Sequence, residues 1–409
     1  MHVPIGKIWR QGVRAAASTT AGLLLVGGTA AQAQADSTRS QQWYLDAMHA
    51  EEMWRTSTGK GITVAVIDTG VDPKNPDLQG RVLDGKDFAP SSRPGDEHTD
   101  DDGHGTGMAG LIAGTGAYGG GNGAFGLSPG AKILPIRMPE SGDVNPFATS
   151  AFFSKAIRYA ADSKARVINI SMGGATDTAE LTGAVRYAIR KGSLIFAAVG
   201  NDAGKADKID YPAATPGVVG VAAVGKSLNR ASFSQYGPQV DVAAPGEDMV
   251  HACGGKTGLC KTSGTSDATA LASASAALIW SKHPDWTNNQ VLRVMLNTIG
   301  APTNGAKRND SIGYGIVRPR VALQDPGDPG PADVYPLPDL AAATSSPSAS
   351  PTAAAQNKGG PDGQGGARAA SPASEYSVGL WVGLGAAAVV LLGGVGVAYT
   401  LVRKRRSAA

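Results

Sequence analysis

The sequence has little net charge. Its 37 Lys and Arg residues against 34 Asp and Glu residues give +3 over 409 residues, and no basic stretch lies in its central region. Proteins that bind nucleic acid usually carry a large basic excess or a basic block, so nucleic acid is excluded as the expected partner. The length is enough for one large core with tails at its ends.

Cysteine is also scarce, with two residues in the whole chain. Cys253 and Cys260 enclose a short glycine-rich loop, and we expect them to form a disulfide in an oxidising compartment. His251 lies nearby and raises a metal site as the alternative. A zinc site normally needs four ligands, and these three candidates have no fourth. We therefore expect no metal ion and no other cofactor.

The first 35 residues have the layout of a secretory signal peptide. Lys7, Arg10 and Arg14 precede an uncharged stretch, and the small-residue run A-Q-A-Q-A follows it. A basic start, a short apolar middle and small residues at the cleavage point are typical of such peptides. We predict cleavage after Ala33 or Ala35. An uncleaved anchor is the alternative, and the shortness of the apolar stretch disfavours it.

Residues 377–402 contain no charged side chain and are followed by R-K-R-R at 403–406. This length spans a bilayer of about 30 Å with some tilt, and basic residues beside a membrane helix stay in the cytoplasm. We therefore predict a transmembrane helix over 377–402 and a cytoplasmic tail over 403–409. The protein would be a type I cell-membrane protein whose remaining residues lie outside the cytoplasm.

The region before that helix divides into a linker and a folded part. Residues 324–376 are rich in Pro, Ala, Ser and Gly and lack an apolar period, which predicts a linker. The folded part is expected to comprise an N-terminal extension over 36–60 and a domain over 61–323.

Short apolar runs alternate with helical patterns inside the predicted domain. Runs that lack charged interiors predict strands buried on both faces at 62–67, 132–137, 166–170, 194–199 and 218–224. Apolar residues at helical spacing predict helices over 149–163 and 178–191. This alternation predicts an α/β fold with a mainly parallel sheet and helices on both faces. Functional residues in such folds gather at the carboxyl ends of the strands.

Two candidate functional residues follow from that placement. Asp68 ends the first predicted strand, although an Asp before Thr-Gly is also an ordinary turn residue. His104 lies between two glycines at the start of an apolar helical run, and glycines let other groups approach its ring closely. The acidic residues at 100–102 are interpreted as a solvated loop or a cation site, and His283 as a structural residue at a helix end.

Two further polar residues follow apolar runs. Asn201 comes after the strand predicted at 194–199 and could donate a hydrogen bond to an oxyanion, or simply occupy a turn. Ser266 precedes the apolar run L-A-S-A-S-A-A-L-I-W. Its hydroxyl could cap that helix, could act as a nucleophile, or could do both.

Together these four residues supply the parts of a serine nucleophile site. A serine hydroxyl needs a base to accept its proton, the base needs a carboxylate to hold its tautomer, and the oxyanion needs a donor. Asp68, His104, Ser266 and Asn201 match those roles, and the order Asp, His, Ser is that of subtilisin.

The segments V-I-D-T-G-V-D, G-H-G-T and S-G-T-S resemble the three catalytic motifs of the subtilisin family (subtilases). The resemblance covers about 42–320 and implies the subtilisin-like three-layer fold and the hydrolysis of peptide bonds as a serine endopeptidase. It also implies the triad Asp68, His104 and Ser266 with Asn201 in the oxyanion hole. The segment I-N-I-S-M-G-G is similar to one that pairs with the substrate backbone, which implies that Ser171, Met172 and Gly173 bind substrate.

A closer resemblance is to the mycosins, membrane-anchored subtilases associated with type VII secretion in actinobacteria. It is carried by Q-Q-W-Y-L-D-A-M-H-A-E-E-M-W before the first strand, the proline-rich segment, the terminal apolar segment and the basic tail. This resemblance implies a type VII secretion complex in the same membrane as the partner. The alternative is a structural subunit of that complex with residual protease activity. An esterase is disfavoured because no G-x-S-x-G surrounds Ser266.

The sequence departs from the family pattern near its motifs. Gly107 stands where most subtilases have a second histidine, and Asp267 and Ala270 stand where most have Met and Pro. Asp267 would place a negative charge near a site that develops negative charge, and we expect it to slow catalysis. The segment between the predicted cleavage site and Gln41 is also too short for the long inhibitory propeptide of many subtilases, so we expect folding to need none or activity to be controlled differently.

Asp77 matches a position that helps to bind calcium in many subtilases. The rest of such a site is not recognisable in G-G-G-N-G-A-F-G, and calcium is not predicted.

Overall fold

The computed structural model describes residues 37–345, apart from 141–142, 205–208 and 255–257. Its strands are β1 (Thr63–Asp68), β2 (Lys86–Asp87), β3 (Lys132–Arg137), β4 (Val167–Ile170), β5 (Leu194–Ala198), β6 (Val219–Val224), β7 (Val242–Pro245), β8 (Met249–Ala252) and β9 (Leu259–Thr262). Its helices are α1 (Thr38–Gln41), α2 (Trp43–Ala47), α3 (Ala50–Trp54), the 3-10 helix η1 (Pro76–Leu78), α4 (His104–Ala113), α5 (Tyr118–Gly121), α6 (Pro146–Asp162), α7 (Ala179–Arg190), α8 (Thr265–Lys282), α9 (Asn288–Asn297), α10 (Pro319–Gln324) and α11 (Pro338–Ser345).

Seven strands form one sheet in the order β2-β3-β1-β4-β5-β6-β7, and every pair in it is parallel. The carboxyl ends of parallel strands lie at the same edge of a sheet, so residues that follow β1, β4 and β5 are neighbours there. The five predicted strands correspond to β1, β3, β4, β5 and β6, each with bounds within one residue of the prediction. The remaining strands, β2 and β7 to β9, were not predicted.

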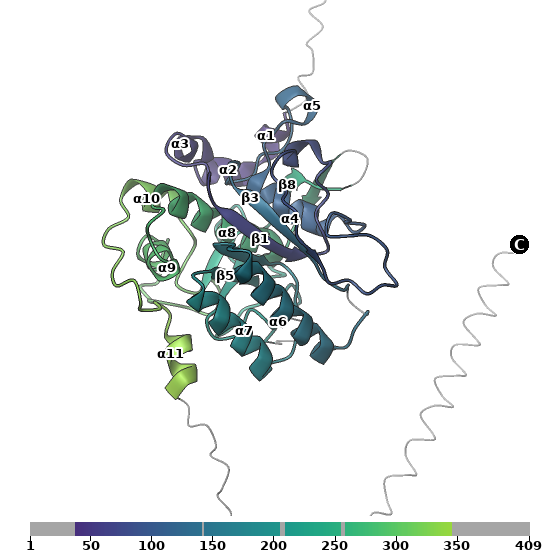
Figure 1. Cartoon of the computed structure of the whole chain (residues 1–409). Coiled ribbons are helices and arrows are strands. Elements are labelled where there is room, and N and C mark those ends of the chain that lie inside the picture. Colours follow the sequence, from purple (N-terminus) through teal and green to yellow (C-terminus); the bar gives the residue numbers. More distant parts are fainter. Residues whose placement is uncertain (1–36, 141–142, 205–208, 255–257, 346–409) are drawn as a thin grey trace, which may run out of the picture. The chain divides into compact units, whose positions relative to one another are not determined.

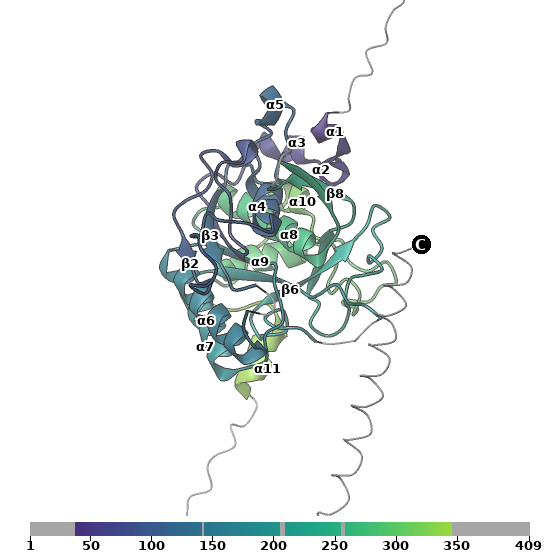
Figure 2. The same cartoon turned by 90° about the vertical axis from the view of Figure 1, so that its right-hand side faces the viewer.

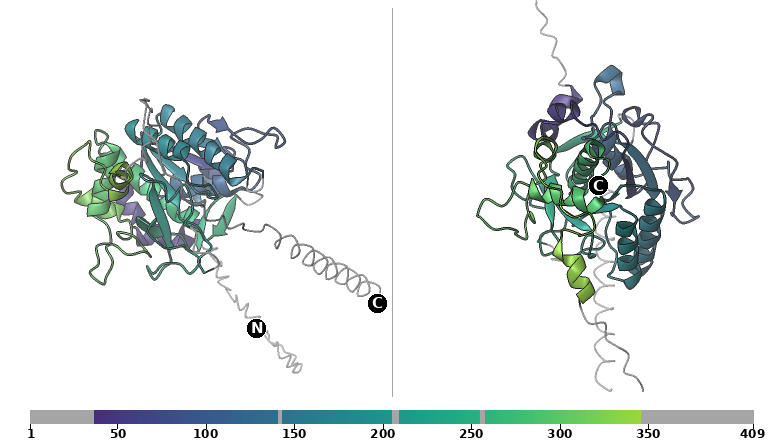
Figure 3. Two further views of the ribbon diagram at one scale, coloured as in Figure 1. Left: turned by 90° about the horizontal axis from the view of Figure 1, so that it is seen from below. Right: turned by 60° about the vertical axis from the view of Figure 1, so that its left-hand side comes forward.

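Helices cover both faces of this sheet. Val64 and Val66 of β1 pack into the core shared with α4 and α8, whereas Ala65 and Ile67 pack into the core shared with α6 and α7. Figure 1 shows α6 and α7 side by side on one face, and Figures 2 and 3 show the same layers from other directions. The predicted α/β class with a parallel sheet between two helical layers is confirmed.

Helix α8 runs through the interior of the molecule. Every residue from Thr265 to Trp280 is buried, which fits a helix that is apolar or small on all sides. Alanines and serines predominate along it, so it can pack closely against the sheet. This buried helix carries Ser266 in its first turn.

The N-terminal extension packs against the domain through short helices. Gln42 Nε2 donates to the carbonyl oxygens of Phe125 and Val250, and the Tyr44 hydroxyl also donates to Val250 at 2.8 Å. Tyr44 is fully buried. The extension therefore supports β8, which forms an antiparallel hairpin with β9.

The folded part continues beyond the boundary that we predicted at residue 323. Arg293 donates to the carbonyl oxygens of Pro329 and Pro331, and Leu337 is 2% exposed. The prediction that the linker starts at 324 is wrong for 325–345, because carbonyl groups and a few apolar side chains hold this proline-rich segment to the domain without an apolar period.

The predicted signal peptide (1–35), transmembrane helix (377–402), basic tail (403–409) and the rest of the linker lie outside the described residues. Among the residues that the structure does describe, no helix has both the length and the apolar character needed to cross a membrane.

Candidate active site

Asp68 and His104 are in direct contact. Asp68 is the last residue of β1 and is fully buried, and its Oδ1 accepts a hydrogen bond from Nδ1 of His104 over 2.6 Å. The His104 side chain is 33% exposed. When the ring is neutral, this contact keeps the proton on Nδ1 and leaves Nε2 without one, which is the form a general base needs.

Glycines allow that contact. Gly103 precedes α4 with φ 83°, a conformation that favours glycine. A Cβ on Gly105 would lie 2.0 Å from the carbonyl oxygen of Gly70 and 3.1 Å from Cβ of Asp68. Only a glycine lets the first turn of α4 approach the end of β1 this closely.

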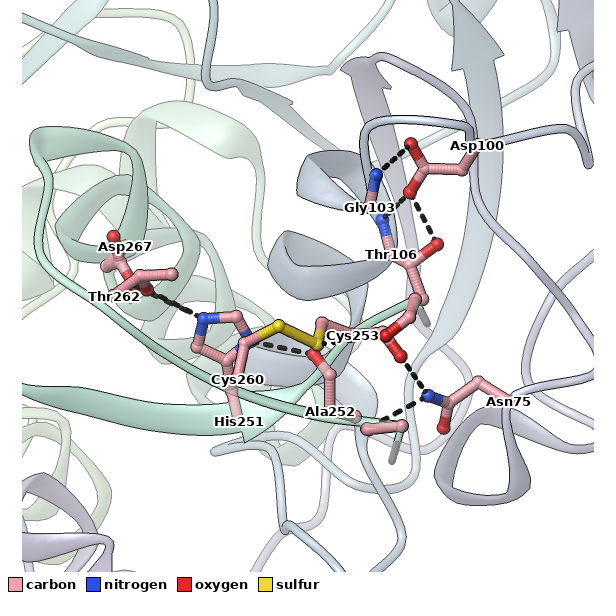
Figure 4. Close-up of a disulfide and its surroundings, with 12 residues drawn as sticks. Asn75, Asp100, Gly103, Thr106, His251, Ala252, Cys253, Cys260, Thr262 and Asp267 are labelled. Atoms are coloured by element: carbon pink, nitrogen blue, oxygen red, sulfur yellow. Dashed lines mark hydrogen bonds and ion pairs between the residues drawn. A yellow bond between two sulfur atoms is a disulfide. The ribbon is translucent and has the colours of Figure 1, made fainter. Parts of the chain in front are cut away.

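The carboxylate of Asp100 also stabilises the first turn of α4, a role that was not predicted from the sequence. Its carboxylate accepts hydrogen bonds from the backbone N–H groups of Gly103 and Thr106 and from the hydroxyls of Thr106 and Thr69. Figure 4 shows this carboxylate at the start of α4. Asp100 therefore acts at the N-terminus of the helix that bears His104, where an anion is favourable. An Asp three or four residues before the helix was the available signal.

The carboxylate of Asp68 raises the pKa of His104 from its ordinary value to about 9, against the opposing effect of burial. The hydrogen bond from Nδ1 to Asp68 acts in the same direction. The imidazolium form is therefore stabilised in the resting site.

Ser266 is the second residue of α8 and does not cap it. The capping residue is Gly264, which makes no side-chain hydrogen bond, so the capping interpretation of Ser266 is wrong. The Ser266 side chain is buried, and its hydroxyl donates to the carbonyl oxygen of Ser171 over 3.0 Å. Ser171 directly follows β4, so the Ser266 hydroxyl lies at the same sheet edge as Asp68.

Asn201 lies against the first turn of α8. Its Oδ1 accepts hydrogen bonds from the backbone N–H and the hydroxyl of Thr265, both over 2.9 Å. Oδ1 is therefore committed to the residue before Ser266, and the Nδ2 amide remains as a donor. The residue itself is exposed to solvent.

The predicted substrate segment extends beyond β4. Ser171 is buried, Met172 is half-buried and Gly173 is exposed. Met172 and Gly173 line a pocket of about 180 Å³ together with Met138, Glu140 and Phe152. Asp210 fixes the end of the segment by accepting from the N–H of Gly174.

Cys253 and Cys260 form a disulfide that closes the end of the β8–β9 hairpin (Figure 4). Asn75 donates to the carbonyl oxygens of Cys253 and Gly258 and so joins this hairpin to the loop after β1. The three candidate ligands are otherwise engaged, because both sulfurs are joined in the disulfide and Nε2 of His251 is bonded to the Thr262 hydroxyl. Within the described ranges no group of three or more potential ligands could hold a metal ion.

Asp77 has a structural role. Its carboxylate accepts hydrogen bonds from the backbone N–H groups of Tyr118 and Ala124, and its side chain is fully buried. These two bonds hold the loop between α4 and β3.

Two of the three departures from the family pattern, Gly107 and Asp267, lie beside His251. His251 fills the space beside Gly107, where a Cβ would lie 2.7 Å from Cε1 of the ring. The Asp267 carboxyl bonds to the Thr262 hydroxyl. Asp267 is 2% exposed, and burial raises its pKa. The expectation of a charged Asp267 beside the nucleophile is therefore not supported by its surroundings.

Comparison with known proteins agrees with these motifs. The model of the subtilase family matches residues 59–315. Subtilisin E of Bacillus subtilis is 37% identical over 236 residues, which are 57% of this chain and 59% of that protein. Thermitase of Thermoactinomyces vulgaris is 36% identical over 59% of this chain and 83% of its own length. The chain thus spans about six tenths of the length of subtilisin E.

Solved structures give a more specific likeness. The MycP3 protease from the type VII (ESX-3) secretion system is 34% identical, with a TM-score of 0.60, over 68% of this chain and 87% of that one. MycP1 from Mycobacterium smegmatis is 27% identical, with a TM-score of 0.62, over 71% and 86%. A chain of the periplasmic assembly from the ESX-5 inner membrane complex is 27% identical, with a TM-score of 0.63, over 79% and 92%.

Proposed function

Because the chain belongs to the subtilase family of serine peptidases and is related to the mycosins of type VII secretion, we propose that it hydrolyses peptide bonds through Asp68, His104 and Ser266. The observation that carries this proposal is the hydrogen bond between buried Asp68 and Nδ1 of His104. This bond orients His104 as a base at the edge of the sheet, where the Ser266 hydroxyl also lies.

The reaction follows from the roles of these groups. Nε2 of His104 accepts the Ser266 proton while Oγ attacks the substrate carbonyl carbon, and the imidazolium then protonates the leaving amine. A water molecule then attacks the carbonyl carbon of the acyl-enzyme while Nε2 of His104 accepts its proton, and the imidazolium returns a proton to Oγ of Ser266. For this, the Ser266 hydroxyl must exchange its bond with the Ser171 carbonyl for one with His104. Catalytic hydrogen bonds often form only when substrate is bound.

Asn201 would stabilise the oxyanion. Its Oδ1 is held by Thr265, so its Nδ2 group has a fixed direction and can donate to the developing negative charge. A donor that is already oriented needs no reorganisation during the reaction. The start of α8 adds a favourable dipole at the same place.

The substrate would bind along residues 171–173. This segment follows β4 and becomes progressively exposed, from buried Ser171 to exposed Gly173, which suits pairing with an extended peptide at its outer end. A substrate side chain would enter the pocket beside Met172.

The cellular setting comes from the sequence and the structural neighbours. A signal peptide, a type I transmembrane helix and a basic tail would place the protease outside the cytoplasm at the cell membrane. The likeness to MycP1, MycP3 and a chain of the ESX-5 assembly favours a type VII secretion complex as its partner. That last likeness also favours the alternative function, a structural subunit with weak protease activity.

A fluorophosphonate probe, which labels activated serine nucleophiles, tests the proposal on the full chain. Wild type should be labelled, whereas Ser266→Ala and His104→Ala should not. Ser263→Ala is the matched control, because Ser263 lies just before α8 and should leave labelling unchanged. Folded wild type that resists the probe would contradict the proposed triad and favour the structural role.

A further inference from the structure

A second set of hydrogen-bonding side chains lies beside the triad and is not used by the mechanism above. Oγ1 of Thr262 lies 2.5 Å from Oδ1 of Asp267 and 2.7 Å from Nε2 of His251. Nδ1 of His251 lies 2.7 Å from the carbonyl oxygen of Ala252. Figure 4 shows the His251 ring between Ala252 on one side and the side chains of Thr262 and Asp267 on the other.

These hydrogen bonds join the elements that carry the proposed nucleophile and base. Asp267 follows Ser266 in α8, and Thr262 ends β9. His251 in β8 packs against α4 at Gly107, one turn after His104, where a Cβ would come within 2.7 Å of its ring. Asp267 and His251 are each 2% exposed, so water cannot replace these bonds.

The hydrogen bonds determine how many protons these three side chains share. The Ala252 carbonyl can only accept, so Nδ1 of His251 must carry a proton. The two bonds among Nε2, Thr262 Oγ1 and Asp267 Oδ1 need two protons, and the Thr262 hydroxyl supplies one. The other must reside either on Asp267, with a neutral imidazole, or on His251, with an ionised carboxylate.

Burial decides between these two states. Removing a carboxylate and an imidazolium from water is costly, and here the atoms that would bear the charges, Nε2 and Oδ1, are 3.7 Å apart. Burial raises the pKa of Asp267 and lowers that of His251, while the attraction between them offsets part of each effect. The raised pKa of Asp267 and the lowered pKa of His251 both favour a protonated carboxyl beside a neutral imidazole.

We propose that Asp267, Thr262 and His251 form a neutral relay in which protonated Asp267 donates to Thr262, Thr262 donates to Nε2 of His251, and His251 donates to Ala252. These are positioning residues: they hold the first turn of α8 against the hairpin and, through Gly107, against α4. For its effect on catalysis the inference rests on the proposed triad, whereas the protonation of Asp267 does not.

Other titratable groups around Asp267 do not alter this assignment. His104 on α4 lowers the pKa of Asp267 less than burial raises it. Tyr44 on α2 is fully buried, and burial raises its pKa far above the usual range, so it stays neutral. With Asp267 protonated, no negative charge at this position opposes the oxyanion.

Infrared difference spectroscopy of the full chain tests the proton directly. The spectrum of wild type minus Asp267→Asn at neutral pH should show the loss of a protonated carboxyl band. Asparagine can replace the carboxyl as donor to Thr262, so this variant should fold. Loss of an ionised carboxylate band instead would overturn the relay, whatever the activity of the protein.

Kinetics test the positioning role. Thr262→Val keeps the side-chain shape but removes the bridging hydroxyl, and small displacements of catalytic groups can cost up to about 100-fold. We expect it to lower kcat about 10–100-fold with little change in KM. Thr262→Ser, which restores the hydroxyl, should return activity to within about threefold of wild type. Equal activity of the Val and Ser variants would refute the positioning role.

The pH dependence of kcat/KM is a second test of whether Asp267 is protonated or ionised. If Asp267 is neutral, Asp267→Asn leaves the acid limb of kcat/KM, which follows His104, where it is in wild type. A charged Asp267 would instead raise the pKa of His104, so the same substitution would move that limb to lower pH and contradict the relay. Failure of wild type to react with the fluorophosphonate probe would contradict the triad alone, since the infrared result is independent of it.

Discussion

Oδ1 of Asp68 lies 2.6 Å from Nδ1 of His104, and this carboxylate raises the pKa of the imidazole to about 9. A general base must be neutral before it can accept a proton. The strength of this ion pair therefore sets the pH at which the proposed triad becomes active.

The first prediction concerns the pH dependence of activity. The raised pKa means that His104 keeps its proton through neutral pH, so kcat/KM should rise with pH and reach half of its plateau near pH 9. The measurement is a pH series of kcat/KM on a peptide substrate. A half-plateau at the ordinary histidine value of about 6.5 would show that Asp68 has little influence on the base.

The second prediction separates the two contacts of Asn201. Asn201→Ala should lower kcat by about 10²–10³ with little change in KM, as removal of one oxyanion donor does in serine proteases. Asn201→Asp is the matched variant, because its carboxylate can still accept from Thr265 but cannot donate. Both variants should be equally impaired in kcat; a nearly active Asp variant would mean that Asn201 only holds the start of α8.

The sequence predicted the parts of the fold that are determined locally. Strands β1, β3, β4, β5 and β6 are buried on both faces, so their runs are mostly apolar and easy to recognise. Strand β7 is V-A-A-P, and its two alanines and its proline are residues that strands disfavour, so it gives a weak signal. The segment after 324 was assigned to a linker because its attachment uses backbone carbonyl groups, which leave no signal in the side-chain sequence.

The site was predictable where a motif defines it and not where distant segments meet. Asp68, His104 and Ser266 lie in the three motifs, and Asn201 follows the apolar run at 194–199. The structure places all four near the carboxyl edge of the sheet. The direction of the Asp267 carboxyl depends on Thr262 and His251, and that of Asp100 on the start of α4. The position of Asp100 just before α4 was a local signal that was not used. The contacts of Asp267 cannot be read from its neighbours in the helix, so Asp267 was interpreted as a charge near the nucleophile.

The third prediction concerns the disulfide. Replacing Cys253 and Cys260 by Ala should lower the free energy of unfolding by about 2–3 kcal/mol, the loop-closure effect for a cross-link across seven positions. Urea denaturation of both proteins measures this difference. Because the hairpin also holds His251, the variant should show lower kcat as well. Reduced wild type should match the variant in both respects, and unchanged stability in either would contradict the prediction.

The fourth prediction concerns Asp241, which lies far from the triad in the sequence. Burial, with a smaller contribution from the nearby Asp339, raises its pKa to about 8, although the Gly220 N–H opposes this. The folded state therefore binds a proton that the unfolded state releases above its ordinary pKa of about 3.9.

Stability should consequently fall as pH rises between those two values, by up to about 1.4 kcal/mol per pH unit from this group. Asp241→Asn keeps an acceptor for Gly220 and should be more stable than wild type at pH 8 but not at pH 4. Urea denaturation at both pH values tests this. A constant difference between the two proteins would mean that Asp241 has an ordinary pKa.

The last prediction concerns the contact between α4 and the hairpin. Gly107→Ala places a methyl group 2.7 Å from Cε1 of His251, and the buried ring has no room to retreat, because both of its nitrogens are bonded. We expect this variant to lower stability by about 1–3 kcal/mol and to lower kcat, because the collision displaces the helix that carries His104.

A double-mutant cycle shows whether the collision is specific. His251→Ala removes the ring and leaves a cavity that a methyl group on residue 107 can partly occupy. Adding Gly107→Ala to His251→Ala should therefore cost much less stability than adding it to wild type. Gly105→Ala in the His251→Ala background is the control, because its obstacle is the carbonyl oxygen of Gly70 and nothing is relieved. Additive effects of the first pair would mean that His251 does not couple the hairpin to the helix of the catalytic base.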